Sequence, residues 1–135
     1  MVLSVIEQNF TKEVLESPVP VLVNFWAPWC GLCRNIQPLL LQFQAGCGEQ
    51  IKLVGVNADE NFKLSNSHRL TTLPTLLLIK EGKVIKRLDS FRGRDDLRLA
   101  LEEIRITYVA DAQKNYAGVL SGSSPAIDWE CRSVL

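Results

Sequence analysis

The chain has no excess of charge of either sign, no long apolar run and few cysteines. Its 135 residues hold 15 lysines plus arginines against 15 aspartates plus glutamates, so the net charge favours neither nucleic acid nor an acidic membrane surface as a partner. No apolar run approaches the roughly 18 residues that a membrane-spanning helix needs, and no basic leader precedes an apolar stretch at the N-terminus. We therefore expect a cytoplasmic protein that binds neither nucleic acid nor membrane.

The scarcity of cysteine excludes a second group of proteins. Four cysteines are too few for the dense disulfide framework of a small secreted protein, and a chain of this length buries an apolar core without such staples. Only Cys30 and Cys33 stand at a motif spacing, and Cys47 is expected to be a small packing residue. A structural zinc site takes four ligands, whereas this sequence offers one close pair and His68, which we expect at a solvated helix end. We expect a reducing compartment, no metal and no bound cofactor.

Apolar periodicity predicts that strands and helices alternate along the first part of the chain. Expected strands cover residues 2–6, 19–27, 51–56, 75–79 and 84–88, and expected helices cover residues 10–16, 30–45, 61–70 and 95–106, with Asp95 as the cap of the last one. Helices connect the parallel strands, whereas the Glu81–Gly82 turn makes the last two strands an antiparallel hairpin. The predicted fold class is α/β, with a mixed sheet covered by helices on both faces.

The helical pattern changes after Ile106. Gly118 and residues 121–125, which are rich in serine and glycine, are typical of a flexible linker, and an apolar stretch with Cys131 follows. We predict one domain over residues 1–106 and a C-terminal extension over residues 107–135 that is flexible in part. Disorder is the default for such a terminus. Alternatively, the extension is a docking segment for a partner, or its Cys131 thiol reaches Cys30 or a second subunit.

The most specific feature is the run VLVNFWAPWCGLC at residues 21–33, in which an apolar strand ends in two cysteines and a helix begins. Backbone N–H groups and the helix dipole stabilise a thiolate at such a place. Cys30 would then be the outer, attacking sulfur, and Cys33 the inner sulfur that resolves a mixed disulfide. Inert buried thiols are the alternative, but the start of a helix after a buried strand is a poor place for mere packing.

The segments NFWAPWCGLC and LPTLLLIKEGK, together with Pro38 in the following helix and the later Gly93, resemble the thioredoxin family. The resemblance covers roughly residues 2–106. It implies a thioredoxin fold and a thiol-disulfide oxidoreductase in which Cys30 attacks a protein disulfide and Cys33 releases the mixed disulfide. It also implies a thioredoxin reductase as the electron donor.

The same resemblance implies a substrate-binding rim around the cysteine pair. Pro74 is expected to be a cis proline against the pair, although the residues alone favour a trans turn proline, and the backbone of Leu73 is expected to pair with an extended substrate. Trp26 is expected to support the active-site loop from beneath. The apolar rim would consist of Trp29, Gly31, Leu73, Pro74 and Gly93.

Two positions depart together from the family pattern. Asn24 stands where thioredoxins usually carry a buried aspartate that helps to move the proton of the inner cysteine, and Gly55 aligns with the lysine that often pairs with this acid. Loss of only one member of a buried ion pair would leave an uncompensated charge. The absence of both the acid and the lysine therefore indicates that the two positions changed together and that the site is not merely damaged. Our hypothesis is that Cys33 loses its proton through water or to substrate, with slower turnover and a simpler pH profile.

Leu32 is a further departure, because reducing members of the family have CGPC where this chain has CGLC. Residues between the cysteines tune the reduction potential, and loss of the rigid proline is expected to make the pair more oxidising. An isomerase or oxidase with the same chemistry therefore stays open. A second alternative is a non-catalytic binding module that docks a protein partner through a peptide groove around Pro74, and the departures at Asn24 and Gly55 and the C-terminal tail favour it.

Overall fold

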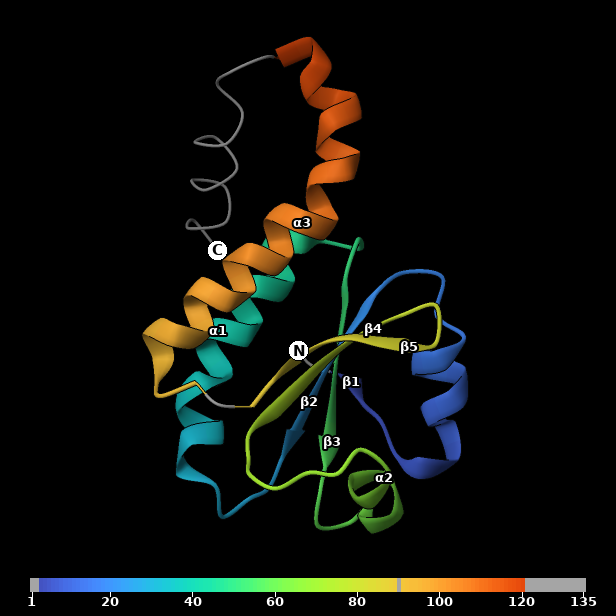
Figure 1. The fold of residues 1–135 in the computed structure, drawn as a ribbon, viewed down its shortest axis with the longest axis vertical. Coiled ribbons are helices and arrows are strands. Elements are labelled where there is room, and N and C mark those ends of the chain that lie inside the picture. Colours follow the sequence, from blue (N-terminus) through green and yellow to red (C-terminus); the bar gives the residue numbers. More distant parts are fainter. Residues whose placement is uncertain (1–2, 90, 121–135) are drawn as a thin grey trace.

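A five-stranded mixed sheet forms the centre of the molecule in a computed structural model that describes residues 3–89 and 91–120 (Figure 1). The strand order is β1-β3-β2-β4-β5. β3 is parallel to both β1 and β2, whereas β4 is antiparallel to β2 and to β5. This arrangement confirms the predicted fold class. The strands are β1 (Leu3–Ser4), β2 (Val21–Trp26), β3 (Lys52–Asn57), β4 (Thr75–Lys80) and β5 (Lys83–Leu88).

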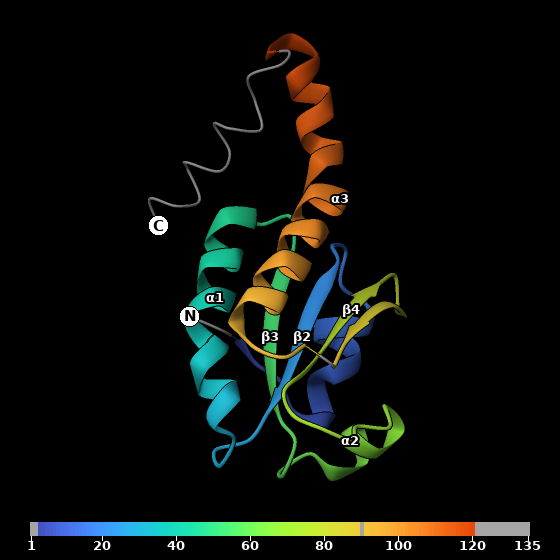
Figure 2. The same cartoon turned by 60° about the vertical axis from the view of Figure 1, so that its left-hand side comes forward.

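Helices cover both faces of this sheet. α1 (Gly31–Cys47) and α3 (Arg94–Leu120) lie side by side on one face, and α2 (Phe62–Ser67) lies on the other (Figure 2). A 3-10 turn η1 (Glu7–Asn9) and a π-helical segment η2 (Thr11–Leu15) replace the helix expected over residues 10–16. None of the helices in the described part of the chain combines the length and the apolar character needed to cross a bilayer.

The period of two along β2 divides its side chains between two cores. Leu22 packs in the cluster that contains residues of α1 and α3, whereas Val23 and Phe25 pack in the cluster on the η2 side. Asn24 lies two residues after Leu22, so it points toward α1, and only 2% of it is exposed. The strand therefore buries a polar side chain beneath the helix that begins at the cysteines.

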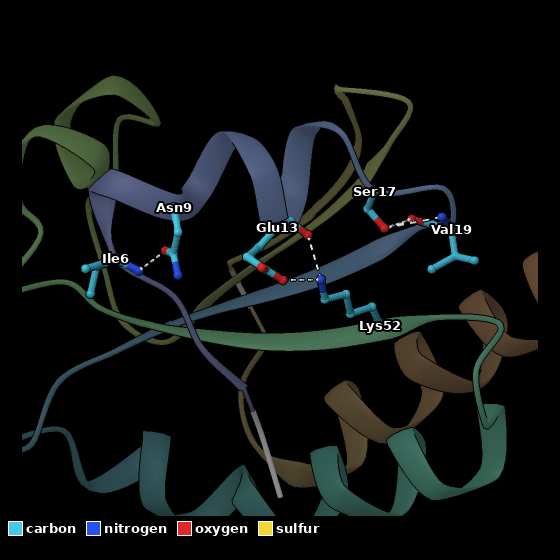
Figure 3. Close-up of polar contacts among 6 residues, drawn as sticks. All are labelled: Ile6, Asn9, Glu13, Ser17, Val19 and Lys52. Carbon is cyan, nitrogen blue, oxygen red and sulfur yellow. Dashed lines mark hydrogen bonds and ion pairs between the residues drawn. The ribbon is translucent and has the colours of Figure 1, made fainter.

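Polar contacts fix the η2 segment to the sheet. The Lys52 ammonium at the start of β3 donates hydrogen bonds to the Glu13 carboxylate at 2.7 Å and to the Glu13 carbonyl at 3.0 Å (Figure 3). The Ser17 hydroxyl donates to the Val19 carbonyl at 2.8 Å just before β2 begins. These contacts hold the connection that precedes β2.

The last helix differs from its expected bounds. α3 continues past Ile106 to Leu120, because Tyr108 and Val109 extend its apolar face and pack on the cluster that it shares with α1. The expectation that Asp95 caps this helix is wrong, since Asp95 lies in its first turn. The division of the chain at residue 106 stays a prediction, and Cys131 lies outside the described residues.

Candidate active site

The cysteine pair sits at the junction between β2 and α1. Cys30 is the N-cap of α1, and its sulfur accepts a hydrogen bond from the backbone N–H of Cys33 at 3.1 Å. The two cysteines form a disulfide across the first turn, with their Cα atoms 5.3 Å apart. Both are buried. The first turn of the helix therefore aims a backbone donor at the outer sulfur, where a thiolate would gain from it and from the helix dipole.

The topology brings the Leu73–Pro74 segment to the same end of the sheet. Phe25 of β2 is paired with Thr75 of the antiparallel β4, so the residue before Thr75 lies beside the end of β2 that leads to the cysteines. The Leu73–Pro74 peptide bond is cis, as the resemblance implies. Pro74 is buried and Leu73 half-buried.

Trp29 and the two rim glycines differ in their surroundings. The Trp29 indole is 67% exposed and donates a hydrogen bond to the Asp59 carboxylate at 2.8 Å. Gly31 is exposed, and a Cβ added to it would meet nothing within 4 Å. Gly93 precedes α3, where its carbonyl accepts from the N–H of Leu97 at 3.3 Å. An open surface therefore surrounds Trp29 and Gly31, and the place of Gly93 in a substrate rim stays a prediction.

Asp59 is a site residue that the sequence reasoning missed. It lies in the turn after β3, where its backbone N–H donates to the side chain of Asn57 at 2.9 Å. A usable signal was present, because β2 and β3 are parallel neighbours and their carboxyl ends meet at one edge of the sheet. Polar residues after β3 could thus have been expected beside the loop that follows β2.

Asn24 and Gly55 are direct neighbours in the parallel pairing of β2 with β3. The Asn24 side-chain oxygen is buried and has no hydrogen-bond partner among the described residues. A pocket of about 620 Å³ opens at this place, and Asn24, Gly55 and Cys33 all line it. The two departures from the family pattern therefore share one cavity with the inner cysteine.

The remaining wall of this pocket is partly apolar and carries one charge. Its other lining residues are Leu3, Ser4, Trp26, Ala27, Pro28, Arg34 and Gln37. Arg34 follows the cysteine pair, is exposed, and donates a hydrogen bond to the Pro28 carbonyl. None of the described lining residues is acidic, so none of them offers a carboxylate to take the Cys33 proton.

Three further residues that were expected near the cysteine pair differ in what they pack against. Leu32 is half-buried and packs against the cluster that α1 shares with α3. Trp26 is half-buried and lines the pocket rather than the opposite core. Pro38 lies within α1 and is exposed. In the described part of the chain, no three His, Cys, Asp or Glu side chains are placed to hold a metal ion.

His68 lies at the end of α2 as its C-cap residue, but it is half-buried rather than solvated, which corrects part of the sequence expectation. Its ring lies 5.7 Å from the rings of both Phe10 and Phe25, and its Nε2 is buried without a partner among the described residues. Burial, and next the nearby charge of Arg87, lower the pKa of His68 from its ordinary value. Cys47 is buried in the cluster between α1 and α3, in keeping with a packing role.

Comparison with known proteins agrees with this geometry. The family model described as Thioredoxin matches residues 1–103. Thioredoxin 1 of Nostoc sp. is 42% identical over 99 residues, which cover 73% of this chain and 92% of that protein. Thioredoxin 1 of Synechococcus elongatus is 41% identical over 90 residues, which cover 67% of this chain and 81% of that protein. The thioredoxin of Bacillus subtilis is 35% identical over 92 residues, covering 68% and 86%.

Proposed function

This chain belongs to the thioredoxin family and is a thiol-disulfide oxidoreductase, and we propose that Cys30 is its attacking sulfur and Cys33 its resolving sulfur toward protein disulfides. The observation that carries this assignment is the hydrogen bond from the Cys33 N–H to the Cys30 sulfur at the start of α1. A thiolate on Cys30 would keep this donor after reduction, whereas Cys33 lies inside the helix and lines the pocket next to Asn24.

The proposed cycle has two exchange steps. In the first, the Cys30 thiolate attacks a substrate disulfide, a mixed disulfide forms, and the second substrate sulfur leaves as a thiolate. In the second, Cys33 loses its proton and attacks the Cys30 sulfur, which closes the Cys30–Cys33 disulfide and releases the first substrate sulfur. Two electrons from a thioredoxin reductase, the donor that we propose, then restore the dithiol.

Water in the pocket is the proton acceptor that we propose for Cys33. The cavity is large enough for several waters, and Asn24 and Cys33 both line it. The amide of Asn24 cannot itself take up a proton at neutral pH. The Cys33 proton would therefore leave through solvent, without a protein carboxylate.

Replacement of each cysteine tests the assignment. The Cys33→Ser variant should accumulate a mixed disulfide between Cys30 and a protein substrate such as insulin, detected by mass spectrometry, because the resolving thiol is absent. The Cys30→Ser variant should form no such adduct and should lose turnover. Cys47→Ala serves as the control, since Cys47 lies in the core away from the pair. Turnover in the Cys30→Ser variant would contradict the assignment.

Leu32 favours a second candidate, an isomerase or oxidase that uses the same two sulfurs. This side chain packs on the core where reducing members of the family have a proline. The reduction potential of the pair, titrated with Cys47 and Cys131 replaced by serine, separates the two functions. A value of about −270 mV supports a reductase, and one of about −180 mV or higher supports isomerase or oxidase work.

The setting of this activity is also a proposal. We propose that the protein acts in the cytoplasm, which the scarcity of cysteine and the single motif pair support. We also propose that residues 1–106 form the catalytic domain and residues 107–135 an extension. The match to the family over residues 1–103 supports that division.

A further inference from the structure

We propose that Asn61 is a positioning residue for the surface that receives protein substrates. Asn61 fixes the turn that carries Asp59, and through Asp59 it sets the place of the Trp29 indole. Its expected effect on activity rests on the proposed reaction with protein disulfides at Cys30, whereas its effect on the Trp29 indole does not.

The Trp29 indole is held by a hydrogen bond more than by packing. The side chain is 67% exposed, so neighbouring residues constrain little of its surface. Its N–H donates to the Asp59 carboxylate at 2.8 Å. Trp29 directly precedes Cys30, the N-cap of α1. The place of Asp59 therefore decides how the ring lies beside the attacking sulfur.

The turn after β3 fixes the backbone of Asp59. The Asn57 side-chain oxygen accepts hydrogen bonds from the N–H of Asp59 at 2.9 Å and from that of Glu60 at 3.3 Å, as asparagine often does in a turn. The N–H of Ala58 donates to the Trp26 carbonyl at 2.8 Å. Figure 1 shows this turn, α2 and the loop after β2 at the same end of the molecule. The position of Asp59 is therefore set by Asn57.

Asn61 holds the backbone of Asn57 from the buried side. Only 3% of Asn61 is exposed. Its amide N–H donates to the Asn57 carbonyl at 2.9 Å, and its side-chain oxygen accepts from the Glu7 N–H at 3.0 Å. Buried polar groups with their partners in place make a structure rigid. The Asn61 amide thus ties the turn to η1, which lies more than fifty residues earlier in the chain.

Asn61 does not serve as an ordinary helix cap. It is the N-cap residue of α2, a position from which asparagine commonly accepts from the first helical N–H groups. Within the described part of the chain, its side chain makes no such bond. The Glu7 carboxylate takes that place and accepts from the N–H of Lys63 at 2.9 Å and of Leu64 at 3.2 Å. Loss of the Asn61 amide should therefore loosen Asp59 without removing this cap of α2.

The indole N–H signal of Trp29 reports this positioning directly. We would measure it in the ¹H–¹⁵N NMR spectrum of the oxidised full-length chain at pH 7.5, and identify it by its loss in Trp29→Phe. Asp59→Ala gives the position of the signal without the hydrogen bond. Asn61→Asp should move the signal about halfway or more toward that position, because an aspartate suits the N-cap but has no N–H to donate to Asn57. Asn61→Ser, whose side chain is shorter, should give a similar shift.

The matched variant is Asn66→Ala, which removes an exposed asparagine of the same helix. It should leave the Trp29 signal in place. An unchanged signal in Asn61→Asp and Asn61→Ser, or an equal shift in Asn66→Ala, would overturn the positioning role.

Insulin reduction separates positioning from a purely structural role. With dithiothreitol as the electron donor, Asn61→Asp should raise the KM for insulin about fivefold, the size expected for the loss of one hydrogen bond, and keep kcat within about twofold of the natural chain. Asn66→Ala should change neither constant. A residue that only stabilised the fold would lower the urea midpoint and leave the KM of the folded protein unchanged. An unchanged KM in Asn61→Asp would therefore overturn the role in substrate binding.

The NMR measurement involves no turnover, so its outcome is independent of the Cys30 and Cys33 assignment. The adduct that Cys33→Ser should trap on Cys30 in turn requires no contact of Asn61. Loss of the Asn61 effect therefore leaves the assignment of the two sulfurs intact. Turnover in Cys30→Ser would likewise leave the positioning of Trp29 intact.

Discussion

At position 24 the chain buries an amide beside the pocket that Cys33 lines. Asn24 and Gly55 are paired across β2 and β3, so the two places where the resemblance implies an acid and its lysine are adjacent in the sheet. Neither residue carries a charge, and they line a cavity in which the Asn24 oxygen has no hydrogen-bond partner among the residues that the structure describes. The joint change avoids the uncompensated buried charge that a single change would leave.

Restoring only the acid should therefore bring no benefit. In Asn24→Asp, burial without a lysine at position 55 raises the pKa of the new carboxyl, so that it stays protonated near neutral pH and cannot act as a base. We expect no gain in the rate of insulin disulfide reduction at pH 7. The double variant Asn24→Asp with Gly55→Lys should gain, because the lysine keeps the carboxyl ionised. A clear gain from Asn24→Asp alone would contradict this account.

His68 makes stability depend on pH. Its pKa in the folded protein is lowered by burial and by Arg87, whereas in the unfolded chain it titrates near its ordinary value of about 6.5. Between that value and the lower folded pKa, the unfolded chain binds the proton and the folded protein does not. The free energy of unfolding is therefore unaffected by His68 above pH 6.5 or so and falls as the pH drops below it.

The measurement is urea unfolding at pH 7.5 and at pH 5.5 for the natural chain and for His68→Phe. Phenylalanine keeps a ring between Phe10 and Phe25 but does not titrate. The natural chain should lose more stability than the variant on acidification. Equal losses in the two proteins would show that His68 is not the group responsible.

At the scale of elements, the start of α1 decides how the two sulfurs are held. Leu32 is in the first turn of this helix, one residue before the Cys33 N–H that donates to Cys30. Proline is tolerated in the first turn, because the N–H that it removes has no helical partner there. Its fixed backbone angle would hold this turn more rigidly.

Leu32→Pro should consequently make the pair more reducing. We expect the reduction potential of the cysteine pair to fall by about 30 mV or more, toward the value of about −270 mV that thioredoxin has. Leu32→Ala is the matched variant, since it removes the leucine packing without fixing the backbone. The two potentials, titrated against dithiothreitol with Cys47 and Cys131 replaced by serine, should differ. Equal potentials in the two variants would exclude backbone rigidity as the cause.

Sequence patterns predicted the secondary-structure elements better than they predicted the contacts between them. The strands and α1 were predictable, because their apolar period and the cysteine motif are local signals. The contact of Trp29 with Asp59 and the burial of His68 depend on segments brought together by the sheet, and no local pattern encodes them. The pocket likewise depends on the pairing of Asn24 with Gly55, for which the family pattern gave only the positions.

At the scale of the whole molecule, α3 carries the chain past residue 106, the boundary predicted from the sequence. Its first half packs against α1 through Leu97, Leu101 and Ile104, and this packing continues to Val109, of which 3% is exposed. Figure 1 shows the later turns of α3 extending beyond the sheet. The sequence placed the end of the domain at residue 106 because the regular apolar pattern weakens there, yet the core reaches one turn further.

Two truncations separate these boundaries. A chain that ends at residue 106 loses Tyr108 and Val109 from the core, whereas one that ends at residue 113 keeps both and leaves a further turn of helix to hold them. Complete burial of a valine side chain contributes about 2 kcal/mol to stability. The free energy of unfolding of the shorter chain should therefore be lower than that of the longer chain by about that amount. Urea unfolding of the two chains measures the difference. If both chains are equally stable, Val109 does not contribute to the core and the domain ends at residue 106. If the shorter chain is less stable, the domain includes the turn of α3 that was predicted to belong to the extension.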